Sequence, residues 1–143
     1  MKYVVDTNIF NWIIDGRIDR QALPGGGEFV ATHIQVDEIN RTSDQDRRAR
    51  LILTLASTIR ELLPTETTVL DVSRLDWCKL DDGKVYTSIK NALDARNGGR
   101  HANIRDALIA EVAIANCYGL VTADVDLADV ARDHGGEVIH VAV

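Results

Sequence analysis

Apolar residues recur along the chain in short runs that polar and turn-forming residues separate. The pattern predicts strands at residues 2–6, 28–31, 68–72, 119–122 and 137–142. It predicts helices between them at residues 7–14, 33–41, 44–62, 84–96, 103–117 and 125–134. Strands that alternate with helices in this way are typical of the α/β class, in which helices cover both faces of a parallel sheet.

Two local signals support the helix boundaries. Thr32, followed three residues later by Gln35, matches a capping box, which starts the helix that carries Glu38. Gly119 is predicted to stop the helix that carries Asp106. We therefore place both acids on helices.

Further acids lie where a parallel sheet usually has its site. Asp6 ends the first apolar run, and Asp124 directly follows the strand at 119–122. In an open parallel sheet the site lies beyond the carboxyl ends of the strands. With two more acids brought in from their helices, we interpret the set as one metal-binding cluster of Asp6, Glu38, Asp106 and Asp124.

Each of these acids also has a structural interpretation. Asp is a favoured residue at a helix N-cap, so Asp6 and Asp124 could each cap the helix that follows. Asp106 lies three residues after Asn103, a candidate N-cap, and near the positive end of the helix dipole. That placement is compatible with a role as a metal ligand.

Glu38 has a neighbour, Asp37, that offers the same chemistry, and Arg41 could pair with either acid across one helix turn. Helix geometry favours Glu38 as the ligand. It lies one turn from Ile34 and next to Ile39, and therefore nearer the buried stripe of its helix. We predict that Asp37 faces Arg41 instead.

The donors in this cluster are oxygens. Carboxylates, with Asn8 placed to orient a metal-bound water, suit Mg²⁺ or Mn²⁺ rather than zinc. Asp126, two residues after Asp124, is a further candidate ligand, or else part of a loop or helix cap. The four histidines are scattered without zinc-type spacing, and none is assigned as a ligand.

A length of 143 residues, 45% of them hydrophobic, suffices for a single domain at residues 1–143 with a core. Charge interrupts the apolar runs before the roughly 20 residues that a membrane span needs, and no signal-peptide pattern precedes Asp6. We therefore expect a cytoplasmic protein without a membrane segment. Cys78 and Cys117 are isolated, which predicts reduced thiols in or near the core and no disulfide framework.

The net charge of −6 argues against a protein that holds nucleic acid through a broad basic surface. It does not exclude an enzyme that acts on nucleic acid, because divalent cations would neutralise the acids that surround them. Basic residues gather between Arg41 and Arg50 and between Arg96 and Arg105. A solvated helix face is the alternative explanation for each group.

With these acids in place, the chain resembles the PIN-domain ribonucleases, particularly the VapC-type toxins, over nearly its whole length. Asp6-Thr7-Asn8 is similar to the opening Asp-x-Asn element of that family, and residues 32–39 to its helix with a glutamate followed by an aliphatic residue. Residues 106–110 resemble its Asp-x-Leu-Ile-Ala helix, and residues 121–126 its Thr-x-Asp-x-Asp element. The family usually has Phe after the last acid, where this chain has Leu127, a difference that concerns packing more than chemistry.

The resemblance implies a three-layer α/β/α fold with a central, mostly parallel sheet of about five strands. It also implies homodimers, a protein antitoxin, and a Mg²⁺- or Mn²⁺-dependent endoribonuclease that hydrolyses RNA phosphodiester bonds through Asp6, Glu38, Asp106 and Asp124. The remaining assignments are Asp126 as a further metal ligand, Asn8 and Thr122 as supporting residues, and Arg100 and Arg105 as RNA contacts. Single-stranded or looped RNA is the expected substrate, because its backbone and bases are accessible.

Two other functions fit part of the pattern. A phosphoacceptor signalling domain also gathers acids around Mg²⁺, but it needs a lysine near the C-terminus, and no lysine follows Lys90. A catalytically inactive PIN-like scaffold that only binds partners would share the fold and lack the chemistry. Metal binding separates that scaffold from the enzyme.

Overall fold

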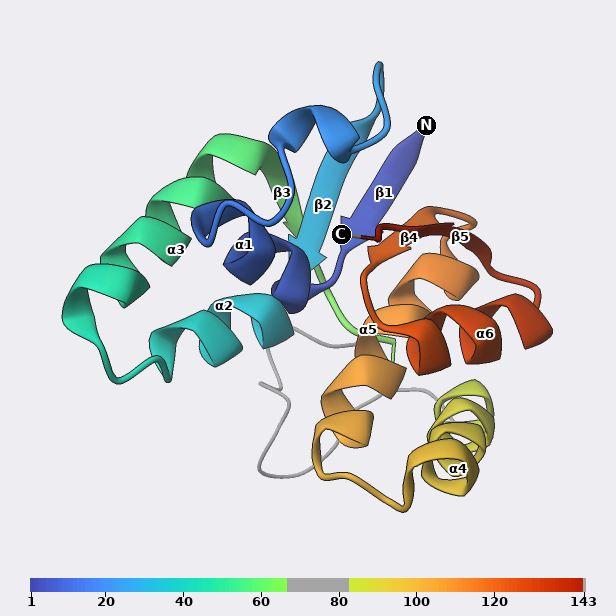
Figure 1. The fold of residues 1–143 in the computed structure, drawn as a ribbon. Helices are drawn as coiled ribbons and strands as arrows, with labels where there is room; N and C mark the ends of the chain where they lie inside the picture. Colours follow the sequence, from blue (N-terminus) through green and yellow to red (C-terminus); the bar gives the residue numbers. More distant parts are fainter. Residues whose placement is uncertain (67–82, 143) are drawn as a thin grey trace.

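The structure, a computed structural model, describes residues 1–66 and 83–142 (Figure 1). Five parallel strands form one sheet in the order β3-β2-β1-β4-β5. Val4 of the central strand is in register with Val30 on one side and Leu120 on the other. The strands are β1 (Lys2–Val5), β2 (Glu28–Thr32), β3 (Ile59–Leu63), β4 (Gly119–Thr122) and β5 (Glu137–His140).

Helices lie on both faces of this sheet. One face carries α1 and α3, and the other carries α5 and α6, with α4 packed against these two (Figure 1). Helix α2 follows β2 directly and contacts α1, α3 and α5. The expected three-layer α/β/α fold is therefore confirmed. The helices are α1 (Thr7–Ile14), the short 3₁₀ helix η1 (Arg20–Ala22), α2 (His33–Asn40), α3 (Gln45–Thr58), α4 (Lys84–Asn97), α5 (Ala102–Ala115) and α6 (Val125–Asp133).

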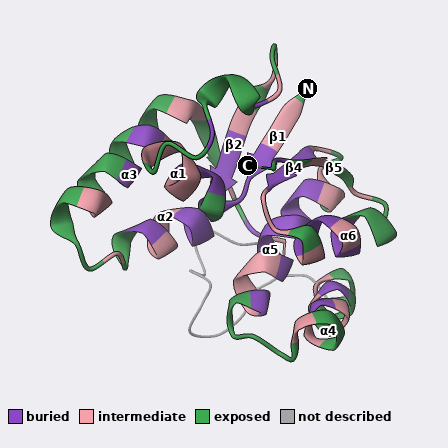
Figure 2. Ribbon diagram, in the orientation of Figure 1, coloured by how far each residue is buried: buried purple, intermediate pink, exposed green. Residues whose placement is uncertain are grey.

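The period of two in β1 divides the core between the two faces. Val4 packs with Leu108 of α5, whereas the next residue, Val5, packs with Phe10 of α1 and Leu51 of α3. Both valines are fully buried, and buried positions fill the inner sides of the helices (Figure 2). The strand that ends at Asp6 is therefore fixed from both sides.

One predicted element is wrong. The helix predicted at 44–62 ends at Thr58, and Ile59–Leu63 forms the edge strand β3 instead. Leu62 and Leu63 are in register with Ala31 and Thr32 of β2, and this pairing outweighs the helix preference of the segment. The strand predicted at 68–72 lies outside the described residues, and the other predicted elements agree with the structure to within two residues at each end.

The predicted glycine stop is also wrong. Helix α5 ends at Ala115, and Cys117 adopts a left-handed conformation with φ 57°. Gly119 is the first residue of β4, where a Cβ atom would lie 2.5 Å from the ring of Tyr3, so close packing explains the glycine. Cys117 is free and exposed rather than near the core, and Cys78 lies outside the described residues.

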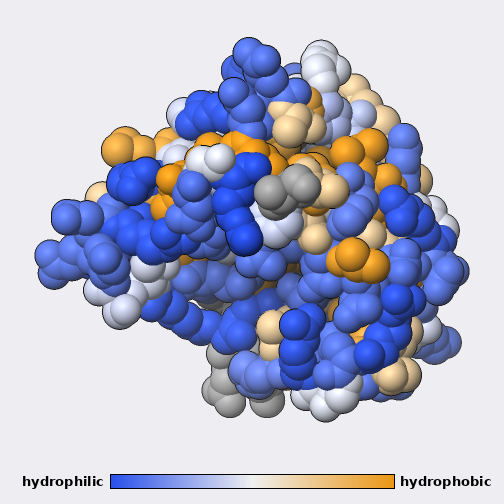
Figure 3. Space-filling model, viewed as in Figure 1, coloured by the Kyte–Doolittle hydropathy of each residue, from blue (hydrophilic) through white to orange (hydrophobic). Residues whose placement is uncertain are grey.

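The surface is mainly hydrophilic in the view of Figure 3, with apolar side chains in separate patches. In the part of the chain that the structure describes, no helix combines the length and apolar character needed to cross a membrane.

Candidate active site

A buried hydrogen-bond network sets the start of α2, the helix that carries Glu38. The Thr32 hydroxyl accepts from the Ile34 amide at 3.1 Å, and the Gln35 side-chain oxygen accepts from the Thr32 amide at 2.9 Å, which confirms the predicted capping box. The Gln35 Nε2 also donates to the carbonyl of Val5 at 3.0 Å. The network therefore joins α2 to the end of β1.

Asp6 stands at the N-cap of α1, yet its side chain makes no capping hydrogen bond. Its carboxylate accepts from the hydroxyl of Thr122 at 2.8 Å, and only 3% of the residue is exposed. The same hydroxyl accepts from the backbone amide of Asp124 at 3.1 Å. Thr122 thus links the end of β1 to the segment after β4, as expected for a supporting residue.

Asp124 occupies the matching position at the start of α6, and here the carboxylate does cap its helix. Its Oδ1 accepts from the amides of Asp126 at 2.9 Å and Leu127 at 3.2 Å. Its Oδ2 accepts from Arg100 at 3.4 Å. The cap that the sequence offered as an alternative is therefore present at Asp124 and absent at Asp6.

Glu38 accepts a hydrogen bond from a residue that was assigned no separate role from the sequence. The hydroxyl of Thr7 donates to Glu38 Oε1 at 3.0 Å, across 31 positions of sequence. Thr7 is buried on the first turn of α1, directly after Asp6. The available signal was a hydroxyl beside the first acid, but the sequence does not show which partner such a hydroxyl finds.

Asp106 lies in the second turn of α5, which begins one residue earlier than predicted. The N-cap of this helix is His101, so the proposed cap at Asn103 is wrong. Asn103 is fully buried and donates to Asp94 of α4 at 2.8 Å, which joins the two helices. The charges of Asp6, Glu38 and Asp124 act on the carboxylate of Asp106, which is therefore near these acids.

Burial and mutual repulsion raise the pKa values of the clustered acids. Burial raises the pKa of Asp6 to about 6, against the Thr122 hydrogen bond and with a contribution from the charge of Asp124. Burial, then the charge of Asp6, raises the pKa of Glu38 to about 7. Burial, then the charges of Asp6 and Glu38, raises the pKa of Asp106 to about 8. The four predicted acids therefore share one electrostatic environment.

Two arginines lie at the border of this cluster. The positive charge of Arg105 opposes the rise in the pKa of Glu38, as does that of Arg41. The charge of Arg100 opposes the rise in the pKa of Asp106. Both arginines proposed for RNA contacts are therefore close enough to act on the acids.

Two further predicted site residues, Asp126 and Asn8, each lie two positions after a clustered acid. The carboxylate of Asp126 accepts from Arg96 Nε of α4 at 3.1 Å, and Arg96 also bonds to Asp129. Asn8 is exposed on the first turn of α1. Asp126 is thus part of an ion-pair network between α4 and α6.

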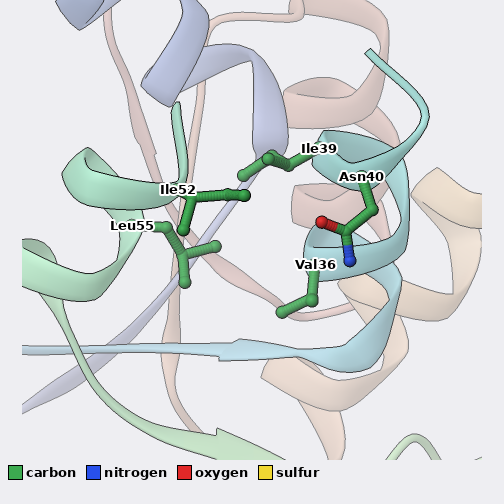
Figure 4. Close-up of a pocket in the computed structure, with 5 residues that line it drawn as sticks. All are labelled: Val36, Ile39, Asn40, Ile52 and Leu55. Carbon is green, nitrogen blue, oxygen red and sulfur yellow. The ribbon is translucent and has the colours of Figure 1, made fainter. Parts of the chain in front are cut away.

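An apolar groove lies on the side of α2 that faces α3. Figure 4 shows the side chains that line it, and Glu38 is not among them. The acids and the groove therefore lie on different sides of α2. The lining residues are Val36, Ile39, Asn40, Ile52 and Leu55.

The donor chemistry of the cluster fits a hard divalent cation, because every candidate ligand is a carboxylate oxygen. Within residues 1–66 and 83–142, no three His, Cys, Asp or Glu side chains are close enough together to hold one ion as they stand. Hydroxyls hold Asp6 and Glu38, and amides hold Asp124. Binding an ion therefore requires these carboxylates to turn toward it.

No family model and no curated protein matches the sequence. Solved structures of toxin–antitoxin proteins match along nearly the whole chain. VapBC2 from Rickettsia felis, bound to a DNA fragment from their promoter, matches at 17% identity over 99% of this chain and 100% of that chain, with a TM-score of 0.63. VapBC-1 from nontypeable Haemophilus influenzae matches at 19% identity over 98% of both chains, with a TM-score of 0.61.

VapBC-5 from Mycobacterium tuberculosis, a member of the VapBC family of toxin–antitoxin systems, matches at 24% identity over 98% of both chains, with a TM-score of 0.53. Similarity at these identities shows the fold. The chain has a VapC-like PIN fold, which confirms the fold that the four motifs implied.

Proposed function

We propose that this protein is a Mg²⁺- or Mn²⁺-dependent endoribonuclease and the toxin of a toxin–antitoxin pair. The observation that carries the proposal is the set of four acids at the carboxyl edge of the sheet, three of which have pKa values raised by burial and by one another. Such mutual repulsion lowers the stability of the ionised cluster, and a bound cation would offset it. The VapC-like PIN fold supports the same conclusion.

Asp6, Glu38, Asp106 and Asp124 are the residues that would hold the metal. A bound ion of this kind supplies a hydroxide at neutral pH and stabilises the charge that develops on the attacking and leaving oxygens. Asp126, whose carboxylate accepts from Arg96, stays a further candidate ligand.

The chain itself supplies orientation and charge. The hydroxyl of Thr122 donates to Asp6 and that of Thr7 donates to Glu38, so both carboxylates are held near the end of β1 before they turn toward an ion. Arg100 and Arg105 provide positive charge beside the acids and would contact the phosphates that flank the scissile bond.

The proposed partners follow from the fold comparison. The matching structures come from systems that contain both a toxin and an antitoxin. We therefore propose a protein antitoxin for this chain, and a homodimer as its assembly. Co-purification with the product of the neighbouring reading frame tests the first proposal, and light scattering of the purified chain tests the second.

An inactive PIN-like scaffold is the second candidate. One observation favours it: no three candidate ligands in the described residues already surround one position. A scaffold would keep the fold and a protein partner but would bind no divalent ion.

Incubation of the purified protein with total RNA, in Mg²⁺ and in EDTA, tests the proposed activity. We expect cleavage in Mg²⁺, none in EDTA, and none in Mg²⁺ with the Asp106→Asn variant. Equal cleavage by wild type and variant would indicate a contaminating nuclease, whereas intact RNA in every reaction would favour the scaffold.

A further inference from the structure

The side chain of Gln35 makes more contacts than its place in a capping box requires. It is fully buried, and its oxygen accepts from both the amide and the hydroxyl of Thr32, at 2.9 and 2.6 Å. Its Nε2 donates to the carbonyl of Val5, 30 positions earlier, at 3.0 Å. The helix cap uses only the oxygen, so the contact to β1 is additional.

The choice of Gln at this position reflects that additional contact. A capping box works with either Glu or Gln, because both carry the acceptor oxygen. An ionised Glu has no hydrogen to donate, whereas the Gln amide donates to a carbonyl while it accepts from the cap. Only the amide therefore connects the start of α2 to the end of β1.

The contact lies where the backbone pairing of β1 with β2 ends. The register between these strands runs from Lys2 to Val4, and Gln35 binds the carbonyl of the next residue, Val5. Asp6 follows Val5 directly, and its own amide donates to Val121 of β4 at 2.9 Å. The amide of Gln35 thus continues the lateral support of β1 up to the first acid.

Gln35, which carries this side-chain amide, lies one helix turn before Glu38. Residues three apart on a helix lie on neighbouring positions of one face, so Gln35 sets the height and rotation of the turn that carries Glu38. The hydrogen bond from Thr7 to Glu38 links the same two segments a second time, at 3.0 Å. Two contacts therefore define the position of Glu38 relative to Asp6.

We propose that Gln35 is a positioning residue that holds Glu38 beside Asp6 by connecting α2 to the end of β1. This inference rests on the proposed function, because the benefit of the arrangement is to keep two proposed metal ligands in neighbouring positions. Residues that orient ligands from outside the coordination sphere typically change metal affinity by about 10- to 100-fold when they are replaced.

The test compares Gln35→Met with Thr32→Val in the full chain. Both replacements approximately conserve volume, both are neutral, and both remove contacts at the α2 cap, but only Gln35→Met removes the contact to Val5. Mn²⁺ affinity is measured by calorimetry, stability by urea unfolding, and opening of the β1 end by amide hydrogen exchange at Asp6 without metal.

We expect the two variants to lose similar stability and to differ in the other two measurements. Gln35→Met should weaken Mn²⁺ binding by about 10-fold or more and speed amide exchange at Asp6, whereas Thr32→Val should change both by less than about threefold. In a Glu38→Gln background, the replacement of Gln35 should have little further effect on Mn²⁺ affinity, because the side chain that it positions is already altered.

A second variant covers the case in which Gln35→Met does not fold. Gln35→Glu keeps the acceptor for the cap and adds an acid near the site, so general electrostatics predict tighter Mn²⁺ binding. Positioning predicts weaker binding at a pH at which the new carboxyl is ionised, because an ionised carboxylate has no hydrogen to donate to Val5. If the Gln35 variant that folds bound Mn²⁺ as tightly as Thr32→Val and showed unchanged amide exchange at Asp6, the inference would be overturned. Wild-type protein that binds no Mn²⁺ would instead contradict the proposed function, while exchange at Asp6 would still test the link to β1.

Discussion

Two strand-to-helix junctions at the carboxyl edge of the sheet, β1–α1 and β4–α6, carry the same residue in the same position and use it differently. Asp6 follows β1 at the N-cap of α1, and Asp124 stands at the N-cap of α6 after β4. The carboxylate of Asp124 accepts from two helix amides, whereas that of Asp6 accepts from the hydroxyl of Thr122 and caps nothing.

This difference indicates that Asp124 contributes to the stability of its own helix, whereas Asp6 contributes mainly to the proposed metal site. The charge of Asp124 stabilises its own helix and is offset in part by Arg100. The charge of Asp6 is buried with other acids nearby, and the pKa of about 6 reflects that cost. An aspartate at the N-cap therefore stabilises the helix at the β4–α6 junction. At the β1–α1 junction the buried charge of Asp6 is destabilising unless a cation binds.

Cleavage by Asp6→Asn and Asp124→Asn gives the largest expected contrast between the junctions. Asp6→Asn should abolish Mg²⁺-dependent cleavage, because it removes a buried ligand charge. Asp124→Asn should retain a measurable part of the activity, since an amide oxygen keeps the cap and the remaining acids keep most of the charge. Initial rates at saturating Mg²⁺ measure this. A more harmful effect of Asp124→Asn would reverse the assignment of the two junctions.

The second contrast concerns two neighbours on α2. Glu38→Gln should lower the cleavage rate by orders of magnitude, because Glu38 meets the β1–α1 junction through Thr7. Asp37→Asn should cost little, because the sequence predicts that Asp37 faces Arg41, and loss of such a surface pair is worth about 0–1 kcal/mol. Side-by-side rates at saturating Mg²⁺ decide the matter. Greater loss in Asp37→Asn would show that the helix phase assigned to α2 is wrong.

The third contrast is in the pH dependence of stability without metal. Burial raises the pKa of Asp6 to about 6 and that of Asp106 to about 8, both above their ordinary value of 3.8. The folded state therefore retains protons that the unfolded chain releases, and these acids lower the stability as the pH rises from about 4 to about 8. Urea unfolding of Asp106→Asn should show a smaller loss over this range than wild type, and parallel curves would contradict the raised pKa of Asp106.

The smallest contrast is in the capping energy itself. Asp124→Ala should lower the free energy of unfolding by about 1 kcal/mol, because two helix amides lose their acceptor. Asp6→Ala should not lower it at neutral pH in EDTA, because burial of the Asp6 charge destabilises the fold by more than its hydrogen bonds, above all that from Thr122, stabilise it. Urea unfolding of both variants measures the difference, and equal destabilisation would place a cap at both junctions.

The sequence was sufficient for the parts of this account that depend on local pattern. The alternation of elements, the capping box at Thr32 and the convergence of the acids followed from spacing and from the usual site of a parallel sheet. The segment after Thr58 was misassigned, because helix-forming residues there pair with β2. The single domain and the homodimer stay predictions.

Contacts between distant segments could not be predicted in the same way. The partner of Thr7 lies 31 positions away and that of Gln35 lies 30 positions away, and neither spacing has a local signature. The two uses of a cap aspartate depend on which hydroxyl lies within reach of the carboxylate. The hydroxyl of Thr122 reaches the carboxylate of Asp6 because β1 pairs with β4.

The central claim is that the acids at the carboxyl edge form a divalent metal site, and a calorimetric titration of Mn²⁺ into the metal-free protein tests it most directly. Wild-type protein should bind with a saturable isotherm, and an excess of the ion of about 100 times Kd should stabilise the fold by about 2.7 kcal/mol. The Asp106→Asn variant should bind far more weakly and gain little stability. Absence of binding to wild type, or equal binding to both proteins, would contradict the claim.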